Sequence, residues 1–138
     1  MSITKPVSEL VAAAKEAKEK SEAAYSHFRV GAAIETESGK IYSAFNIESS
    51  SYGLSMCAER IAIWKAITSG ESKFKRVAIV SDARDFCTPC GACRQVMYEL
   101  AGDIEIIMTN ETGEVKMELL SSLIPHAFTS KTLLNGRD

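Results

Sequence analysis

The chain has 138 residues, 25% of them charged, and a formal net charge of −2. This length favours one globular domain over residues 1–138, and the charge supplies no general attraction for nucleic acid or anionic lipid. No apolar run approaches the roughly 20 residues that cross a bilayer and no signal-peptide pattern is present, so the four cysteines predict a cytoplasmic protein that uses thiols for metal binding or catalysis.

The first predicted element is a helix that starts near Pro6, with Ser8 as its candidate N-cap. Its apolar face is mostly alanine, so a neighbouring element could approach it closely. Apolar and other residues then alternate over 28–35, which predicts a strand with Phe28 as a core aromatic. A turn signal over 36–39 and a second strand over 41–46 complete a hairpin.

Asn46 and Glu48 follow the second strand. Residues two apart project to the same side of an extended chain. Together they offer amide donors and acceptors plus a carboxylate, which suits a sugar hydroxyl. Exposed Asn and Glu are common at strand ends, so this pair alone is a weak signal.

The rest of the chain alternates helices and strands. An apolar helix is predicted over 57–69, followed by a strand over 77–80 and a second helix over 90–101. Strands over 104–108 and 115–117, a brief helix over 119–123 and a loosely ordered tail over 130–138 complete the chain. The order strand, helix, strand, helix, strand over 41–108 predicts an α/β fold in which these strands are parallel neighbours joined by right-handed helical crossovers.

Three cysteines have the spacing of a metal site. Cys90 and Cys93 are one helical turn apart, and Cys57 supplies a third thiolate. Three protein ligands leave the fourth tetrahedral position of zinc open, as in catalytic sites. Glu59 lies two residues beyond the first ligand, where its carboxylate can accept a proton from a water that the metal has acidified. We therefore expect one Zn²⁺ per chain with Glu59 as the catalytic residue.

Cys87 leaves an alternative open. Cys87, Cys90 and Cys93 with Cys57 could close a four-thiolate structural zinc site in a binding module without catalysis. Against this, a closed site gives no reason for a carboxylate beside it. Three thiolates leave the zinc site at net −1, so a cation is needed nearby, and Arg60 is placed to donate to a ligand sulfur.

The segments Cys57-Ala58-Glu59-Arg60 and Pro89-Cys90-Gly91-Ala92-Cys93-Arg94-Gln95 resemble cytidine deaminase, specifically the small homotetrameric type with three cysteine ligands. The zinc deaminases as a class carry a ligand, one residue and Glu, followed later by Pro-Cys-x-x-Cys. The resemblance implies a three-layer α/β/α domain with a mixed five-stranded sheet. It also implies zinc-dependent deamination of cytidine and 2′-deoxycytidine in pyrimidine salvage.

The resemblance further implies roles for individual residues. Phe28 would pack near the pyrimidine ring, Asn46 and Glu48 would bind the ribose, and backbone groups near Ala58 would bind exocyclic atoms of the base. Arg60 would support the metal ligands. Phe128 would reach into the active site of a neighbouring subunit, so that the sites of a homotetramer are shared.

A deaminase of the same fold that acts on blasticidin S or on a modified cytosine nucleoside is the alternative enzyme. Glu48 and Phe128 argue against blasticidin S, because the resemblance places both at a nucleoside site. Ser49, Ser50 and Ser51 depart from the usual continuation of the ribose-binding motif, as does Ala24 from a usual proline.

Overall fold

The computed structural model describes residues 5–134. Its first helix, α1 (Val7–Glu19), begins directly after Pro6, which occupies the N-cap position in an extended conformation. The prediction that Ser8 caps this helix was wrong, because Ser8 already lies in the first turn. The alanine-rich face is buried, as expected: Leu10, Ala14 and Ala17 pack inward.

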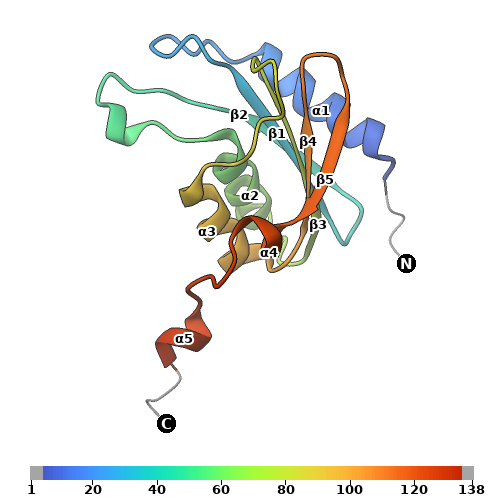
Figure 1. Cartoon of the computed structure of the whole chain (residues 1–138), viewed down its shortest axis with the longest axis vertical. Helices are drawn as coiled ribbons and strands as arrows, with labels where there is room; N and C mark the ends of the chain where they lie inside the picture. Colours follow the sequence, from blue (N-terminus) through green and yellow to red (C-terminus); the bar gives the residue numbers. More distant parts are fainter. Residues whose placement is uncertain (1–4, 135–138) are drawn as a thin grey trace.

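The strands form one mixed sheet in the order β2-β1-β3-β4-β5 (Figure 1). They are β1 (Val30–Thr36), β2 (Ile41–Phe45), β3 (Phe74–Ser81), β4 (Glu105–Thr109) and β5 (Val115–Leu119). Among the strands that the structure describes within residues 5–134, only β3 and β4 are parallel neighbours. The predicted parallel pairing was wrong for β2 and β3, because β1 lies between them and runs antiparallel to both. The predicted hairpin of β1 and β2 is confirmed, and β5 runs antiparallel to β4.

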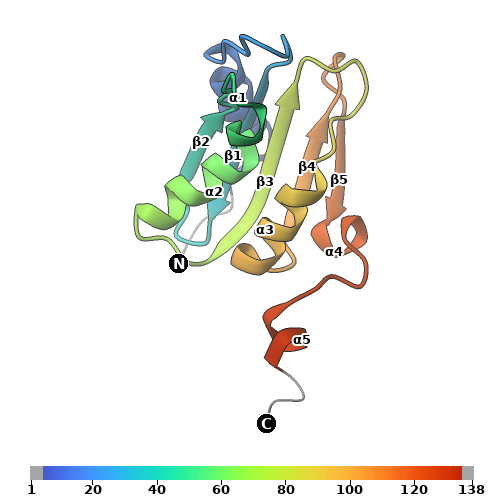
Figure 2. The same cartoon turned by 90° about the vertical axis from the view of Figure 1, so that its left-hand side faces the viewer.

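Helices cover both faces of this sheet, which confirms the three-layer α/β/α prediction (Figure 2). On one face α1 packs on alternate residues of the central strands, such as Ala33 and Ala78. On the other face α2 (Ala58–Thr68), α3 (Gly91–Ala101) and α4 (Leu120–Leu123) pack on the residues between them, such as Ile34 and Ile79. The central strands are therefore buried on both sides, and the amino ends of α2 and α3 are held rigidly.

Gly31 marks the closest approach of α1 to the sheet. A Cβ atom added at Gly31 would lie 1.9 Å from the carbonyl oxygen of Ala14 and 2.6 Å from the amide nitrogen of Lys18. Glycine at this position lets the helix backbone rest directly on β1. The sequence predicted a close approach from the alanines of the helix, and the strand contributes its own small residue to it.

Glu35 is a buried charged residue on β1, which the alternating pattern of the strand does not predict. Both faces of β1 are covered, and the exposed fraction of Glu35 is 0%. Its carboxylate accepts hydrogen bonds from Arg76 Nε at 2.9 Å and from the amide of Lys5 at 2.7 Å. The Arg76 guanidinium also donates to the carbonyl oxygen of Lys5. A buried charge needs this kind of pairing, and here the pair ties the start of the described chain to β1 and β3.

The described part of the chain ends in a short helix, α5 (Ser130–Leu134), none of whose residues is buried. It projects away from the sheet and its helical layers (Figure 2). The predicted loosely ordered tail over 130–138 thus begins as a helix, and residues 135–138 lie outside the described part of the chain.

Candidate metal centre and active site

The amino ends of α2 and α3 bring three cysteines together. Cys57 is the N-cap residue of α2, Cys90 is the N-cap residue of α3, and Cys93 lies in the first turn of α3. Their sulfur atoms all lie within 4.8 Å of one another, with 3.6 Å between Cys57 and Cys90 and 3.4 Å between Cys90 and Cys93. Helix amino ends carry partial positive charge, which favours thiolates.

This arrangement fits a zinc ion. With Zn–S distances of about 2.3 Å, tetrahedral geometry separates ligand sulfurs by roughly 3.8 Å. The sulfur separations of 3.4 and 3.6 Å are close to that value. Three soft sulfur donors converge from two helices, and a tetrahedral ion held by these three alone would keep one position open, as in catalytic sites.

Arg60 lies one helical turn beyond Cys57, and its Nη2 atom donates to Cys57 Sγ at 3.6 Å. The Cys93 thiol and the Arg60 guanidinium together lower the pKa of Cys57 to about 5. Arg60 Nε is buried and has no hydrogen-bond partner among the described residues. The guanidinium therefore contacts one of the three clustered sulfurs, and its role in offsetting their charge stays a prediction.

Glu59 is buried beside the cysteines, with an exposed fraction of 5%. Burial raises the pKa of Glu59 to about 7. A carboxyl group that is neither firmly ionised nor firmly protonated near neutral pH can both accept and release a proton. The neighbouring residue Ala58 is fully buried at the start of the same helix.

Cys57, Glu59 and Cys90 line a cavity of about 290 Å³. Most of the predicted site residues line it, namely Phe28, Asn46, Glu48, Cys57, Ala58, Glu59 and Cys90. The lining also includes Ser26, Val30, Ile47, Ser55, Met56, Cys87 and Thr88. Phe28 is 37% exposed, so its ring is available to a flat ligand. The prediction that Phe28 is a core aromatic residue was therefore wrong.

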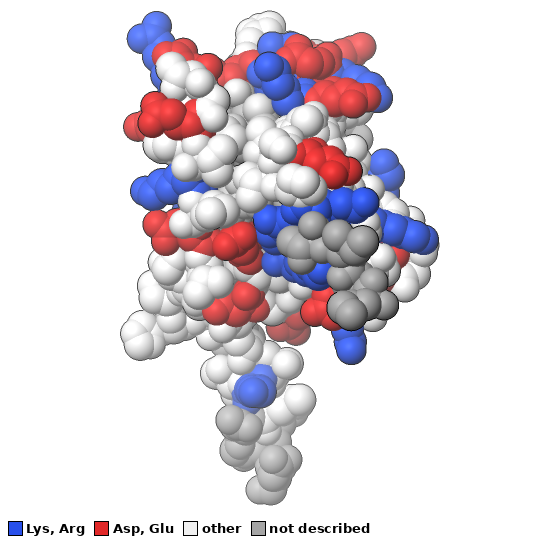
Figure 3. All heavy atoms as spheres, turned by 90° about the vertical axis from the view of Figure 1, so that its right-hand side faces the viewer, with Lys and Arg blue, Asp and Glu red and all other residues white. Residues whose placement is uncertain are grey.

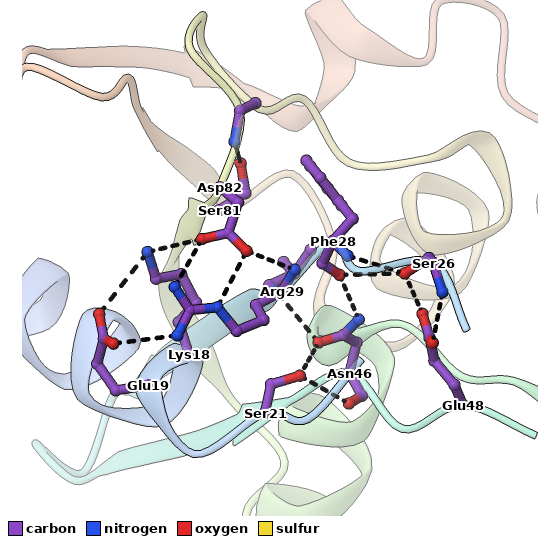
Figure 4. A network of polar contacts seen from close by, with 12 residues as sticks. Lys18, Glu19, Ser21, Ser26, Phe28, Arg29, Asn46, Glu48, Ser81 and Asp82 are labelled. Atoms are coloured by element: carbon purple, nitrogen blue, oxygen red, sulfur yellow. Dashed lines mark hydrogen bonds and ion pairs between the residues drawn. The ribbon is translucent and has the colours of Figure 1, made fainter. Parts of the chain in front are cut away.

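Asn46 is largely engaged by the protein itself (Figure 4). Its Oδ1 atom accepts hydrogen bonds from Ser21 Oγ at 2.7 Å and from the Val30 amide at 3.0 Å. Its Nδ2 atom donates to the carbonyl oxygen of Phe28 at 2.9 Å. One N–H of the amide remains for a ligand, so Asn46 shapes the residue 28–30 segment as much as it could contact a sugar.

Glu48 likewise accepts several hydrogen bonds from the chain (Figure 4). The amides of Tyr25 and Ser26 donate to Oε1 at 2.9 and 3.0 Å, and the Ser26 hydroxyl donates to Oε2. These bonds, led by that of the Ser26 side chain, lower the pKa of Glu48. The carboxylate is therefore ionised and oriented, and a carboxylate has about four acceptor positions, so it can take a further hydroxyl.

Residues 4–109 match the family described as the cytidine and deoxycytidylate deaminase zinc-binding region. The chain belongs to this family. A cytidine deaminase of Sporosarcina psychrophila is 41% identical over 128 residues, which cover 92% of this chain and 94% of the relative. The protein is thus an enzyme of the deaminase class.

Solved structures and a relative with a different substrate extend this comparison. The crystal structure of the cytidine deaminase of Burkholderia pseudomallei superposes with a TM-score of 0.87 at 42% identity, covering 90% of this chain and all of that chain. A blasticidin-S deaminase of Bacillus cereus is 34% identical over 108 residues, covering 72% of this chain and 76% of the relative.

No helix within residues 5–134 of this deaminase-family chain has the length and apolar character needed to span a membrane.

Cys87 lines the cavity of this deaminase-family site but lies outside the group of three clustered sulfurs. Burial raises the pKa of the Cys87 thiol. The fourth-ligand role is therefore unsupported by the geometry, and a paired substitution can test it.

A Cys87→Ser variant is expected to keep one zinc per chain, whereas Cys93→Ser is expected to lose the metal, because only Cys93 belongs to the cluster. The two variants make the same chemical change and are matched controls for each other. Zinc per chain, measured after dialysis against a weak chelator, distinguishes them. Zinc loss from Cys87→Ser would support the four-thiolate alternative.

Phe128 does not reach the cavity of its own chain. Its ring is 57% exposed and lies in a groove with Trp64, Leu100 and Leu133. The side-chain amide of Gln95 donates to the Phe128 carbonyl oxygen at 2.8 Å and holds this segment on α3. Its action on a neighbouring subunit stays a prediction.

Sequence reasoning missed the residues that hold the cavity together. Ser26 is the hydroxyl partner of Glu48, Ser21 is the partner of Asn46, and Asp82 binds the segment next to Phe28. Arg94 donates to the carbonyl oxygens of Pro89 and Leu123, both at 2.7 Å, and fixes the entry to α3. Serine and aspartate in loops carry no periodic signal, so their partners become visible only in the folded chain.

Proposed function

We propose that this protein catalyses the zinc-dependent hydrolytic deamination of cytidine and 2′-deoxycytidine to uridine and 2′-deoxyuridine, with release of ammonia. The observation that carries the proposal is the meeting of three cysteine sulfurs and the buried Glu59 at one cavity. Phe28 and Glu48 line the same cavity, so that a base and a sugar could be bound beside the metal.

Cys57, Cys90 and Cys93 would hold the zinc ion, and Arg60 would offset the charge of the three thiolates. When bound, zinc supplies an activated water for attack at C4 of the cytosine ring. Glu59 would accept one proton of that water and deliver it to N3, and would then move the second proton, from the hydroxyl group added at C4, to the departing amino group, so that the C4=O bond forms as ammonia leaves. The buried position of Glu59 excludes bulk water from this transfer.

The ring would lie against Phe28, and backbone groups near Ala58 would bind its exocyclic atoms. Glu48 would accept a sugar hydroxyl, since its carboxylate is already ionised and oriented by Ser26. Asn46 would support this wall mainly through its bonds to Val30 and Phe28. Binding the sugar in this way would favour nucleosides over the free base.

Ammonia release from the zinc-loaded protein tests the proposal. Cytidine, 2′-deoxycytidine, free cytosine and blasticidin S are assayed in parallel, with zinc counted in the same preparation. We expect turnover of both nucleosides and at least about 100-fold lower kcat/KM for cytosine, because remote binding energy is lost with the sugar. No turnover of the nucleosides at one zinc per chain would contradict the proposal.

Two other functions remain as outcomes of that assay. Turnover of blasticidin S or of a modified cytosine nucleoside in place of the two nucleosides would indicate an altered substrate, and the similarity to a blasticidin-S deaminase makes this the leading enzymatic alternative. A protein that holds zinc through four cysteines and turns over nothing would be a binding module. A polynucleotide substrate is disfavoured by the net charge of −2. Acidic and basic side chains are also interspersed on the face of the molecule shown in Figure 3.

The proposed enzyme would serve pyrimidine salvage as a cytoplasmic homotetramer. The four free cysteines suit a reducing compartment. The exposed Trp64, Leu100, Phe128 and Leu133 form an apolar groove suited to contact with a second copy, and Phe128 would complete the site of that copy. A monomeric mass at micromolar concentration in light scattering would contradict the tetramer.

A further inference from the structure

Asp82 joins two segments that line the active-site cavity. It follows β3 directly and begins the loop over 82–89, which brings Cys87 and Thr88 to the cavity. Its partner Arg29 lies directly before β1 and follows Phe28 in the chain, and Phe28 lines the cavity from this second segment. Figure 4 shows the Asp82 carboxylate and the Arg29 side chain turned toward each other.

The contact involves both backbone and side chain. The Arg29 amide donates to Asp82 Oδ2 at 2.9 Å, and its Nε and Nη2 atoms donate to the two carboxylate oxygens at 3.0 Å each. The Asp82 amide donates back to the Arg29 carbonyl oxygen at 3.1 Å. Val30 and Ser81 are the last paired residues of β1 and β3. Asp82 therefore extends the hydrogen bonding between the two strands by one residue through its side chain, and the two segments diverge beyond it.

This pair is the hydrogen-bonded link between the two segments. Within residues 5–134, the hydrogen bonds between the 82–89 loop and residues 25–30 all run between Asp82 and Arg29. On its other side, the residue 28–30 segment is held by Asn46, which binds the Phe28 carbonyl oxygen and the Val30 amide. Phe28 is therefore fixed from two directions, and one of them depends on Asp82.

The Asp82 link is charged. The hydrogen bonds from Arg29 hold the pKa of Asp82 at about 2, so the carboxylate is ionised near neutral pH. Lys18 on α1 adds a second cation at 3.2 Å from Asp82 Oδ1. The side chains of Arg29, Asp82 and Lys18 are 36%, 26% and 12% exposed, so the Lys18 end of this cluster is the better shielded from water. Charge-assisted bidentate bonds of this kind fix orientation as well as distance.

We propose that Asp82 is a positioning residue for the deamination reaction: by binding Arg29 it holds Phe28 and the Cys87–Thr88 segment in a fixed relative position around the nucleoside. The inference rests on the proposed function for its substrate, whereas the link itself is a property of the fold. Asp82 is outside the described lining of the cavity, so its effect on the reaction is transmitted through the residues that do line it.

The kinetic test is an Asp82→Asn variant assayed with cytidine. Asparagine keeps the size but presents an N–H group to the Arg29 donors, so the bidentate contact is lost. The cavity wall contacts the nucleoside similarly before and during reaction, so we expect KM to rise about tenfold while kcat changes little. An Arg29→Met, Asp82→Asn double variant is expected to be no worse than Asp82→Asn alone, since both changes remove the same link.

Glu19→Gln is the matched control. Glu19 pairs with the same Arg29, at 3.2 Å from Nη1, but does not contact the 82–89 loop. Its loss is expected to leave KM within about twofold of the wild type, because exposed ion pairs contribute little. A tenfold KM increase in Glu19→Gln as well, or an unchanged KM in Asp82→Asn, would overturn the proposal.

Amide hydrogen exchange separates this proposal from the proposed function. In Asp82→Asn, we expect faster exchange in residues 28–30 and 83–88 and unchanged exchange across α2 and α3, whether or not cytidine is the substrate. Absence of nucleoside turnover by the wild type would refute the proposed function alone. Unchanged exchange in both segments, or faster exchange throughout the chain, would refute the positioning role.

Discussion

A Glu59→Gln variant is expected to keep one zinc per chain and to lose about 1,000-fold in kcat for cytidine, because a positioned proton carrier contributes on that order. Glutamine fills the same buried space, so the packing of α2 and the positions of Cys57 and Arg60 should be preserved. Its amide cannot accept a proton from water and pass it to the base. The measurement is kcat at saturating cytidine with the zinc content determined in parallel.

Glu71→Gln provides the comparison. Glu71 lies just beyond the end of α2 and accepts hydrogen bonds from Ser38 Oγ at 2.9 Å and Tyr42 Oη at 3.2 Å, away from the cysteines. This change removes a hydrogen-bonded carboxylate near the other end of α2 without touching the cavity, so turnover should be retained. Near-normal kcat in Glu59→Gln would show that Glu59 is not the proton carrier, and zinc loss would show that it supports the metal instead.

Gly31→Ala is expected to lower the free energy of unfolding by about 3 kcal/mol, at the upper end of the usual cost of overpacking. The new methyl group would lie 1.9 Å from the Ala14 carbonyl oxygen and 2.6 Å from the Lys18 amide nitrogen. Both are backbone atoms of α1, so no side-chain rotation can relieve the clash and the helix must move off the sheet. For a chain of this length the melting temperature should fall by about 10 °C.

Gly53→Ala is the matched substitution, since a Cβ atom at Gly53 would have no heavy atom within 4 Å. Its effect should stay within about 1 kcal/mol, arising from the unfolded chain alone. Urea unfolding of both variants gives the comparison. Equal stabilities would mean that α1 does not rest on β1 at Gly31. Because α1 also carries Lys18, displacement of the helix should weaken the contact with Asp82 as well.

The group of cysteines and Glu59 at the helix ends is the part of this protein that local sequence could predict best. Cys90 and Cys93 are brought together by one turn of a single helix, and Glu59 follows Cys57 at the start of another. Such short-range geometry depends only on the rise and period of a helix. The same holds for the existence of most helices and strands, which follow from hydrophobic periodicity and from glycine and proline signals.

The tertiary structure decided everything that depends on partners distant in sequence. The sheet places β1 between β2 and β3, where the sequence predicted that β2 and β3 would be neighbours. The contacts of Glu35 with Arg76 and of Asp82 with Arg29 each join residues at least 40 positions apart. The hydrogen bonds that engage Asn46 and Glu48 arise in the same way. Periodicity describes which face of an element is apolar, whereas strand order and loop contacts are chosen by the packing of the whole chain. The sequence by itself therefore determined the chemistry at the helix ends, and the fold determined how the wall around that chemistry is held.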